Sequence, residues 1–280
     1  MPELRRFVQV DVFTAAPLKG NPLAVVVDAA GLSDEDMAAF ARWTNLSETT
    51  FLLPPTDPAA DYRVRIFTPG GELPFAGHPT LGSAHAFLAS GGDVKKPGEV
   101  VQQCAIGLVR VKRDGGRLAF AAPPLQRSGP VEEPALRAQA LAALLVAPEA
   151  LLDLVWVDNG PGWMVARLPD AATVRALQPD FVAMQGLKLG VVGACPAGGE
   201  CQFEVRAFVP DLGVPEDPVT GSLNAGLALW LQGAGLAGDV YVAAQGAALG
   251  RAGRVHVKRE ADATWIGGDV TPLIHGQVRL

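Results

Sequence analysis

One strand–turn–helix module occurs twice in this chain, at a spacing close to half of its length. The first copy spans residues 62–88 and the second spans residues 203–230. Arg65 and Arg206 hold the same place in the two strands, 141 residues apart (206 − 65), in a chain of 280 residues. The duplication predicts two similar units, each carrying one strand, one turn and one helix.

The helices of the two copies align at a slightly larger spacing than the strands. Pairing Leu81 with Leu223 gives 142 (223 − 81), which predicts that the second turn is one residue longer. Backbone N–H groups at a helix start lack partners within the helix and attract anions. If the two helix starts faced each other across a cleft, they would form an anion site, and we expect the chemistry to lie at its centre.

Composition fits two folded domains and disfavours several classes of partner. Hydrophobic residues make up 49% of the chain and charged residues 19%, which argues against disorder. A net charge of −6, with no run of Lys or Arg, disfavours nucleic acid and anionic membranes as partners. Because the chain enters a strand pattern at once and has no apolar stretch of about 18–20 residues, we expect neither signal peptide nor membrane helix. Cys104, Cys195 and Cys201 lack metal-type spacing and indicate reduced thiols in a cytoplasmic protein.

Hydrophobic periodicity places strands and helices in alternation along both halves. Ser33 is predicted to cap a helix, because acidic residues fill the turn that follows it. The segment 123–134 is rich in Pro, Gly and charge and indicates a crossing between domains. We expect one domain to comprise residues 1–122 with about 266–280, and the other to comprise 123–265. The strands predicted in the first half cover residues 8–12, 23–27, 49–53 and 62–67.

The two turns of the duplicated module carry candidate binding groups. In the first turn, Gly77 allows a ligand to approach the backbone, and Pro79 sits at the first helical position, where proline is accepted. In the second turn, Gly221 and Ser222 supply N–H groups and a hydroxyl. A single turn of this type is most often a plain helix cap. Two copies in register, each with an ionisable residue, favour a binding site.

Glu48 is the candidate for proton transfer. It follows the first predicted helix and lies between Leu46 and the apolar run 51–53. An exposed loop acid is the alternative reading of this position. A carboxylate held in apolar surroundings has a raised pKa, which suits proton transfer near neutral pH.

Several motifs together resemble the PhzF family, the phenazine-biosynthesis-type isomerases, over nearly the whole chain. This resemblance implies an α/β (α+β) fold of the diaminopimelate-epimerase type, with two pseudo-symmetric domains. Each domain would be a curled sheet around a central helix, with the site in the cleft between the domains. The motifs are Val10-Asp-Val-Phe-Thr14, Gly20-Asn-Pro22, Asn45-Leu-Ser-Glu-Thr49, Glu72-Leu-Pro-Phe-Ala-Gly-His-Pro-Thr80 and Glu216-Asp-Pro-Val-Thr-Gly-Ser222.

The resemblance also implies roles for individual residues. Glu48 would be the catalytic acid/base, supported by His78 and Asp217. The family's best-known reaction isomerises a dihydro-hydroxyanthranilate: a proton leaves one ring carbon and returns at another, and the enol becomes a ketone. The family is commonly homodimeric, so a homodimer is expected, acting on a small-molecule carboxylate. The residues implied to hold the substrate carboxylate are Ser47, Gly77, Thr220, Gly221 and Ser222, together with the backbone of His78.

Two other functions remain open at this level. Related racemases use one Cys at each helix start, but the matching positions here are Ala76 and either Pro218 or Thr220, none of which is a competent base. An epimerase that uses Glu48 with Asp217 or His78 as two bases is still possible. A binding protein without turnover is the second alternative, which the intact acid/base set disfavours. We expect neither a cofactor nor a metal, because no pyridoxal-type Lys or Gly-x-Gly-x-x-Gly motif after a strand is present.

Overall fold

The structure is a computed structural model that describes residues 3–114 and 116–280. The chain divides into two compact units. Unit 1 comprises Met1–Ala121 and Gly267–Leu280, and unit 2 comprises Ala122–Ile266. Across the described residues, no helix is both long and apolar enough to cross a membrane.

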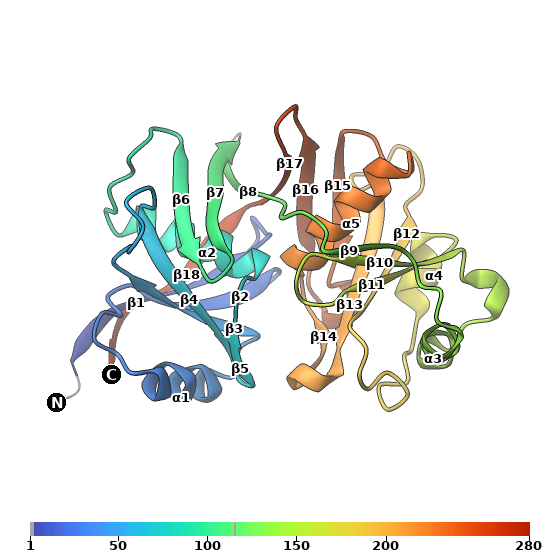
Figure 1. Cartoon of the computed structure of the whole chain (residues 1–280), viewed down its shortest axis with the longest axis horizontal. Coiled ribbons are helices and arrows are strands. Elements are labelled where there is room, and N and C mark those ends of the chain that lie inside the picture. The colour runs from blue at the N-terminus through green and yellow to red at the C-terminus, as the bar shows by residue number, and fades with distance from the viewer. Residues whose placement is uncertain (1–2, 115) are drawn as a thin grey trace. The chain divides into compact units, whose positions relative to one another are not determined.

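Unit 1 consists of strands that enclose one helix, α2, with a second helix, α1, on the outside (Figure 1). The strands pair in the order β18–β1–β2–β3–β4–β6–β7–β8. The predicted strands of this half are present, and Ser33 caps α1 by accepting a hydrogen bond from the N–H of Asp36, as predicted. The elements are β1 (Leu4–Val12), β2 (Asn21–Val26), α1 (Asp34–Thr44), β3 (Glu48–Leu53), β4 (Tyr62–Thr68), β5 (Gly71–Leu73), α2 (Gly77–Ala89), β6 (Glu99–Cys104), β7 (Gly107–Asp114), β8 (Arg117–Ala121) and β18 (Val270–Arg279).

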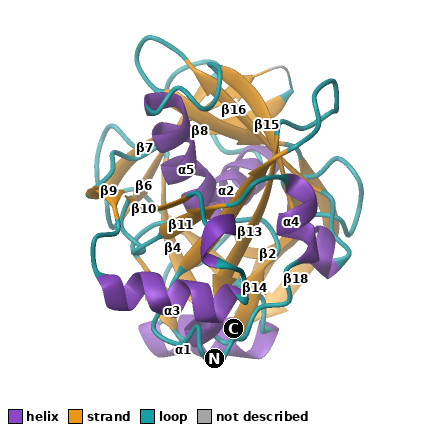
Figure 2. Cartoon of the chain, turned by 90° about the vertical axis from the view of Figure 1, so that its right-hand side faces the viewer, coloured by secondary structure: helices purple, strands orange, loops and turns teal. Residues whose placement is uncertain are grey.

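Unit 2 repeats this arrangement around α5, with α3 and α4 outside its strands (Figure 2). Its strands pair in the order β9–β10–β11–β12–β13–β15–β16. The last strand, β17, runs across the boundary into unit 1. The elements are β9 (Arg127–Pro130), α3 (Pro134–Leu144), η1 (Pro148–Ala150), β10 (Asp153–Asp158), β11 (Met164–Arg167), α4 (Ala171–Ala176), β12 (Leu189–Ala194), β13 (Phe203–Val209), η2 (Pro210–Leu212), β14 (Val214–Asp217), α5 (Gly221–Gly233), β15 (Val240–Gln245), η3 (Ala247–Leu249), β16 (Gly253–Arg259) and β17 (Thr264–Gly268).

The order of strand pairings is the same in both units. From β18 to β7, successive pairs are antiparallel, antiparallel, parallel, antiparallel, parallel and antiparallel. The series from β9 to β16 has the same six senses in the same order. The duplication predicted from the strand–turn–helix module therefore extends to the topology of the whole unit.

The predicted helix offset of 142 was wrong. Strands β4 and β13 start at Tyr62 and Phe203, 141 residues apart (203 − 62), whereas α2 and α5 start at Gly77 and Gly221, 144 apart (221 − 77). The second turn is therefore three residues longer (144 − 141), and the short helix η2 lies in this longer connection. The match of Leu81 with Leu223 pairs two leucines that are not structural equivalents.

Both central helices are buried on nearly all sides, which requires close packing against the strands. A helix that is apolar around its whole circumference belongs inside a core. Gly82 of α2 and Gly226 of α5 are equivalent positions, 144 residues apart (226 − 82). A Cβ atom on Gly82 would lie 2.5 Å from the side chain of Leu23, and one on Gly226 would lie 2.1 Å from the carbonyl oxygen of Val157. The absence of a side chain at these positions allows each helix to approach its sheet.

An aromatic cluster fixes the strand on which Glu48 lies. Phe40 of α1 meets Phe51 of β3 with ring centroids 6.3 Å apart, and Phe51 meets Phe67 of β4 at 5.6 Å. Burial of aromatic side chains is a large contribution to core stability, and edge-to-face contacts add to it. The start of β3 is thereby attached to a rigid part of unit 1.

Candidate active site

Glu48 begins β3, and its side chain is only 13% exposed. The residue pairs with Leu23 of the parallel strand β2. Helix α1 ends at Thr44 and is capped by Asn45, whose left-handed backbone (φ 53°) turns the chain toward β3. Asn is one of the few residues that accept this conformation readily. Ser47 lies in the same turn and is half-buried.

His78 lies in the first turn of α2, and its side chain reaches Glu48. His78 Nε2 is 3.5 Å from Glu48 Oε2, and His78 Nδ1 is 3.3 Å from Asn21 Nδ2. Burial lowers the pKa of His78 to about 3, although a hydrogen bond to the backbone of Pro22 opposes the shift. The imidazole is therefore neutral near pH 7. It stands between an amide and a carboxyl group without forming an ion pair.

Asn21 is placed by a buried aspartate that the sequence analysis did not select. Asp11 of β1 is 1% exposed. Its Oδ2 accepts hydrogen bonds from the N–H groups of Lys19 at 2.8 Å and Gly20 at 3.0 Å. A side chain on Gly20 would collide with the carbonyl oxygen of Val12 at 2.1 Å, so the turn needs glycine at this position. Asp11 and Gly20 thus hold the turn that presents Asn21 to His78.

The start of α2 exposes backbone donors close to His78 in the sequence. The helical hydrogen bonds begin with the N–H of Thr80, which donates to the carbonyl of Ala76. Ala76 makes no side-chain cap hydrogen bond, and Pro79, which is the third helical residue and not the first as predicted, has no N–H. Gly77 and His78 therefore carry the N–H groups that precede the helical pattern.

In unit 2, Asp217 and Thr220 form a hydrogen-bonded turn before α5. Asp217 ends β14, and its Oδ2 accepts a hydrogen bond of 2.6 Å from Thr220 Oγ1. Gln245 of β15 closes the turn. Its Oε1 accepts from the Thr220 N–H at 3.1 Å, and its Nε2 donates to Thr220 Oγ1 at 3.0 Å and to the Asp217 carbonyl at 3.1 Å. Thr220 is the N-cap of α5, as Ala76 is of α2. Of the two residues considered as equivalents of Ala76, the structure therefore selects Thr220 and not Pro218.

Ser222, directly after Gly221 in the first turn of α5, is held from two sides. Trp163 Nε1 donates to Ser222 Oγ at 3.0 Å, and Asn159 Nδ2 donates to the Ser222 carbonyl at 2.9 Å. Both contacts bring residues from the β10–β11 connection to the helix start. Since Oγ accepts from Trp163, the hydroxyl proton of Ser222 points elsewhere and can serve a ligand.

The structure thus gathers the predicted residues into two groups, one in each unit. Unit 1 brings Glu48 together with His78, and unit 2 brings Asp217 together with Thr220. The supporting residues missed by the sequence analysis share one property: they are polar yet buried. Such residues stand out in an otherwise apolar strand or connection, and this signal could have identified them. They are Asp11, Asn21, Asn159 and Gln245, to which the largely apolar but buried Trp163 adds one N–H donor.

The side chains at the two helix starts decide which groups could exchange a proton there. Neither N-cap, Ala76 or Thr220, carries a thiol. Within residues 3–114 and 116–280, no cluster of three or more His, Cys, Asp or Glu side chains could hold a metal ion. The groups that can transfer or accept a proton are carboxyl, imidazole and hydroxyl groups.

Comparisons with known proteins agree with this description. A family model, PhzC-PhzF, described as phenazine biosynthesis-like protein, matches residues 10–276. Antisense-enhancing sequence 1 of Schizosaccharomyces pombe is 40% identical over 226 residues, which cover 77% of this chain and 76% of that protein. Trans-2,3-dihydro-3-hydroxyanthranilate isomerase of Pseudomonas aeruginosa is 36% identical over 261 residues, covering 92% and 91%.

A solved structure supports the fold. A phenazine biosynthesis protein of the PhzF family from Enterococcus faecalis superposes with a TM-score of 0.81 and 27% identity, over 99% of this chain and 100% of that one. The predicted fold class is confirmed.

Proposed function

Because the chain belongs to the PhzC-PhzF family of phenazine biosynthesis-like proteins, we propose that it is an isomerase that moves a proton within a small carboxylate substrate without a cofactor. The relative from Pseudomonas aeruginosa, named as an isomerase of trans-2,3-dihydro-3-hydroxyanthranilate, supports this reaction class. That compound is the first substrate to test.

The contact between Glu48 and His78 carries the proposal. A proton shuttle must hold a proton in one step and release it in the next. His78 is neutral because its burial lowers its pKa to about 3, so it does not hold Glu48 as an anion through an ion pair. Glu48 is then able to alternate between carboxylate and carboxylic acid, while His78 fixes its side chain at 3.5 Å.

We assign the remaining residues to substrate binding. The N–H groups of Gly77 and Gly221 stand at helix starts, where the helix dipole favours a negative charge. Ser222 adds a hydroxyl whose oxygen is fixed by Trp163. Asp217 and Thr220 orient the substrate, and Ser47 lies next to Glu48 in the chain.

The reaction balances without an external reagent. The Glu48 carboxylate takes a proton from a ring carbon, and the electron pair of that C–H bond moves into the conjugated system. After its proton has exchanged with solvent, Glu48 gives a proton to another ring carbon, and the enol that results becomes a ketone. The net change is an isomerisation, with Glu48 back in its starting state.

Exchange with deuterated solvent tests the proposal. The wild-type protein, incubated with trans-2,3-dihydro-3-hydroxyanthranilate in D₂O, should convert it and introduce deuterium at carbon, as seen by NMR. Glu48→Gln keeps the shape but cannot shuttle a proton, so conversion should fall by about 10⁴-fold or more. Glu35→Gln, which removes an exposed carboxylate of α1, is the matched control and should retain full activity.

Three outcomes are informative. Near wild-type exchange by Glu48→Gln would mean that another residue is the base. Binding of the substrate without any exchange by the wild type would favour a binding protein. Exchange that inverts one stereocentre without moving a double bond would favour an epimerase.

A further inference from the structure

Three adjacent strands of unit 2 place Glu204, Ala244 and Arg254 in one row. Glu204 of β13 pairs with Ala244 of β15, and Ala244 pairs with Arg254 of β16. Residues directly opposite each other on neighbouring strands share one face of the sheet, and the strands lie about 4.8 Å apart. The outer two backbones are therefore about 10 Å apart. Because the middle residue has only a methyl group, a hollow is left between two long charged side chains.

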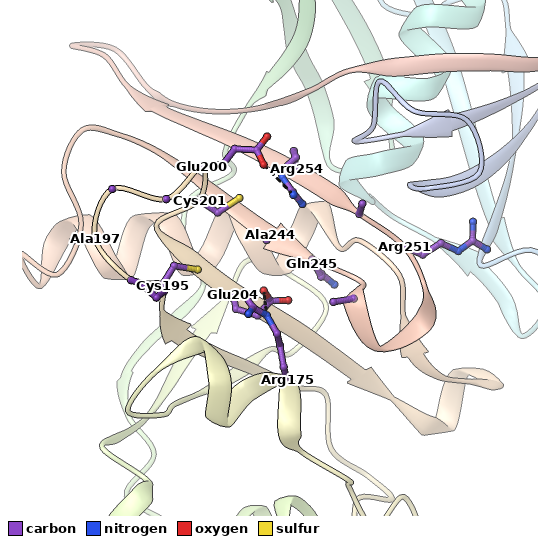
Figure 3. A pocket seen from close by; sticks show the side chains of 15 residues that line it. Arg175, Cys195, Ala197, Glu200, Cys201, Glu204, Ala244, Gln245, Arg251 and Arg254 are labelled. Atoms are coloured by element: carbon purple, nitrogen blue, oxygen red, sulfur yellow. Dashed lines mark hydrogen bonds and ion pairs between the residues drawn. The ribbon is translucent and has the colours of Figure 1, made fainter.

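This row forms part of a cavity of about 630 Å³. Figure 3 shows Ala244 between Glu204 and Arg254, with Arg175 reaching in from α4. Cys195 and Cys201, from the connection between β12 and β13, also line the cavity. None of the residues assigned to substrate binding or proton transfer lines it.

Glu204 brings a buried acceptor to this cavity. The residue is only 2% exposed, and its Oε2 accepts a hydrogen bond of 2.8 Å from Arg175 Nε. Its Oε1 is also buried, and no hydrogen-bond donor for it exists among the described residues. Buried carboxylate oxygens are costly without a donor. A ligand with an N–H or O–H group would satisfy Oε1.

Arg254 brings a buried donor to the same cavity. Its Nη1 donates to the Gly253 carbonyl at 3.0 Å, and its Nη2 donates to Glu200 Oε2 at 3.2 Å. Its Nε is buried and has no acceptor within the described part of the chain. A ligand with a carboxylate oxygen would satisfy Nε, in a charge-assisted hydrogen bond.

We propose that this cavity binds a small zwitterion, specifically a free α-amino acid. The ammonium group donates to Glu204 Oε1, the carboxylate accepts from Arg254 Nε, and the body of the ligand rests on Ala244. A simple anion would leave Glu204 Oε1 without a donor, and a simple cation would leave Arg254 Nε without an acceptor. An amino acid carries both groups on one carbon and matches both needs. The cavity shares Gln245 with the turn of Asp217 and Thr220, but the inference does not rest on the proposed isomerase reaction.

Binding to the wild-type protein is the first test. Each common amino acid is titrated calorimetrically up to about 10 mM, a range in which weak sites of this size are detected. At least one amino acid should bind. Its N-acetyl and carboxamide derivatives, which remove the ammonium and carboxylate charges, should each bind about tenfold more weakly or worse. If no amino acid binds, the proposal is overturned and water is left as the occupant of the cavity. If acetate binds as tightly as the amino acid, the cavity is an anion site and the proposal is also overturned.

Substitutions at three residues of the row test whether the amino acid binds in this cavity, so the result does not depend on a single side chain. Ala244→Leu fills the hollow, and Glu204→Gln and Arg254→Met each remove one charged group. Each variant should weaken the affinity about tenfold or more, whereas Arg137→Met, an exposed arginine of α3, should leave it unchanged. Circular dichroism confirms folding of each variant. Unchanged affinity in the folded Ala244→Leu and Arg254→Met variants would overturn the proposal. Loss of amino-acid binding in Glu48→Gln would also overturn it, because the ligand would then bind at the candidate active site.

Discussion

His78 Nε2 lies 3.5 Å from Glu48 Oε2, and the imidazole that makes this contact is buried and neutral. This contact joins the first turn of a central helix to the first residue of a strand. A charged histidine would hold the carboxylate as an ion pair. A neutral one contacts Glu48 without adding a positive charge beside its carboxyl group, as the proposed proton transfer requires.

The burial of His78 predicts a stability that depends on pH. Its pKa is lowered to about 3 in the folded chain, against an ordinary value near 6.5. Between these values the unfolded chain binds the proton and the folded chain does not, so the free energy of unfolding falls as the pH is lowered. For this one group the loss between pH 7 and pH 5 is about 2 kcal/mol.

Urea unfolding at the two pH values measures this effect. His78→Gln removes the group and should reduce the pH-dependent loss by about 2 kcal/mol. His275→Gln, at an exposed position of β18, should behave as the wild type. The same pH dependence in His78→Gln as in the wild type would show that His78 is not buried as a neutral group.

Asp11 is predicted to be a positioning residue for His78. Asp11→Asn weakens the two hydrogen bonds that hold the turn before Asn21. Because charge-assisted hydrogen bonds contribute about 1.5–3 kcal/mol, we expect kcat to fall about tenfold, with little change in KM. Asp57→Asn is the matched control, since Asp57 also accepts from a backbone N–H in a turn but lies in the connection between β3 and β4. A rise in KM at unchanged kcat would contradict the positioning role.

Two equivalent ion pairs should differ strongly in their effect on stability. Arg65–Glu72 in unit 1 and Arg206–Glu216 in unit 2 are both bidentate. Glu72 is 40% exposed, whereas both side chains of the second pair are 6% exposed. Glu216→Gln leaves a buried guanidinium without its counter-charge and should cost about 3–5 kcal/mol, while Glu72→Gln should cost about 1 kcal/mol or less. Chemical denaturation of the two variants measures the difference, and equal losses would contradict the role of burial.

The central helix of unit 2 should reject a methyl group at one glycine and accept it at another. In Gly226→Ala, the new Cβ would lie 2.1 Å from the Val157 carbonyl oxygen, so either α5 or β10 must move. Overpacking of this kind costs about 1–3 kcal/mol or more. Gly233→Ala, at the end of the same helix, meets nothing within 4 Å and should gain about 0.5–1 kcal/mol from the better helix former. A thermal melt that ranks the two variants the other way would refute the close packing of α5.

The sequence was sufficient for the elements whose pattern is local. The strands that contain Val8 and Tyr62, and the capped helix after Ser33, follow from periodicity and capping. The segment Arg127–Pro130 was predicted only as part of a domain crossing, yet it forms β9. Its Pro130 pairs with Val155, so its strand conformation comes from the neighbouring strand and not from its own residues.

The same distinction applies to the candidate site. Glu48 and His78 were found because they lie in recognisable motifs. Gln245 was missed because its role depends on contacts with Asp217 and Thr220, which precede it by 28 and 25 residues. The turn length was misjudged because two leucines in an apolar helix align equally well at a wrong offset. The helix starts at Gly77 and Gly221 give the true offset, and the packing of Gly82 and Gly226 agrees with it.

The longer connection between β13 and β14 shows that the two halves of a duplicated protein can differ in one turn while their central helices keep the same length. Helix η2 closes on itself, with the N–H of Gly213 donating to the Pro210 carbonyl at 3.3 Å. The strands on either side still pair, with Phe208 opposite Glu216. The added length is absorbed before the chain reaches α5, which keeps the same number of residues as α2. This hairpin is therefore a place where a duplicated ancestor could acquire insertions without disturbing its helix starts, and where loops can be exchanged by design.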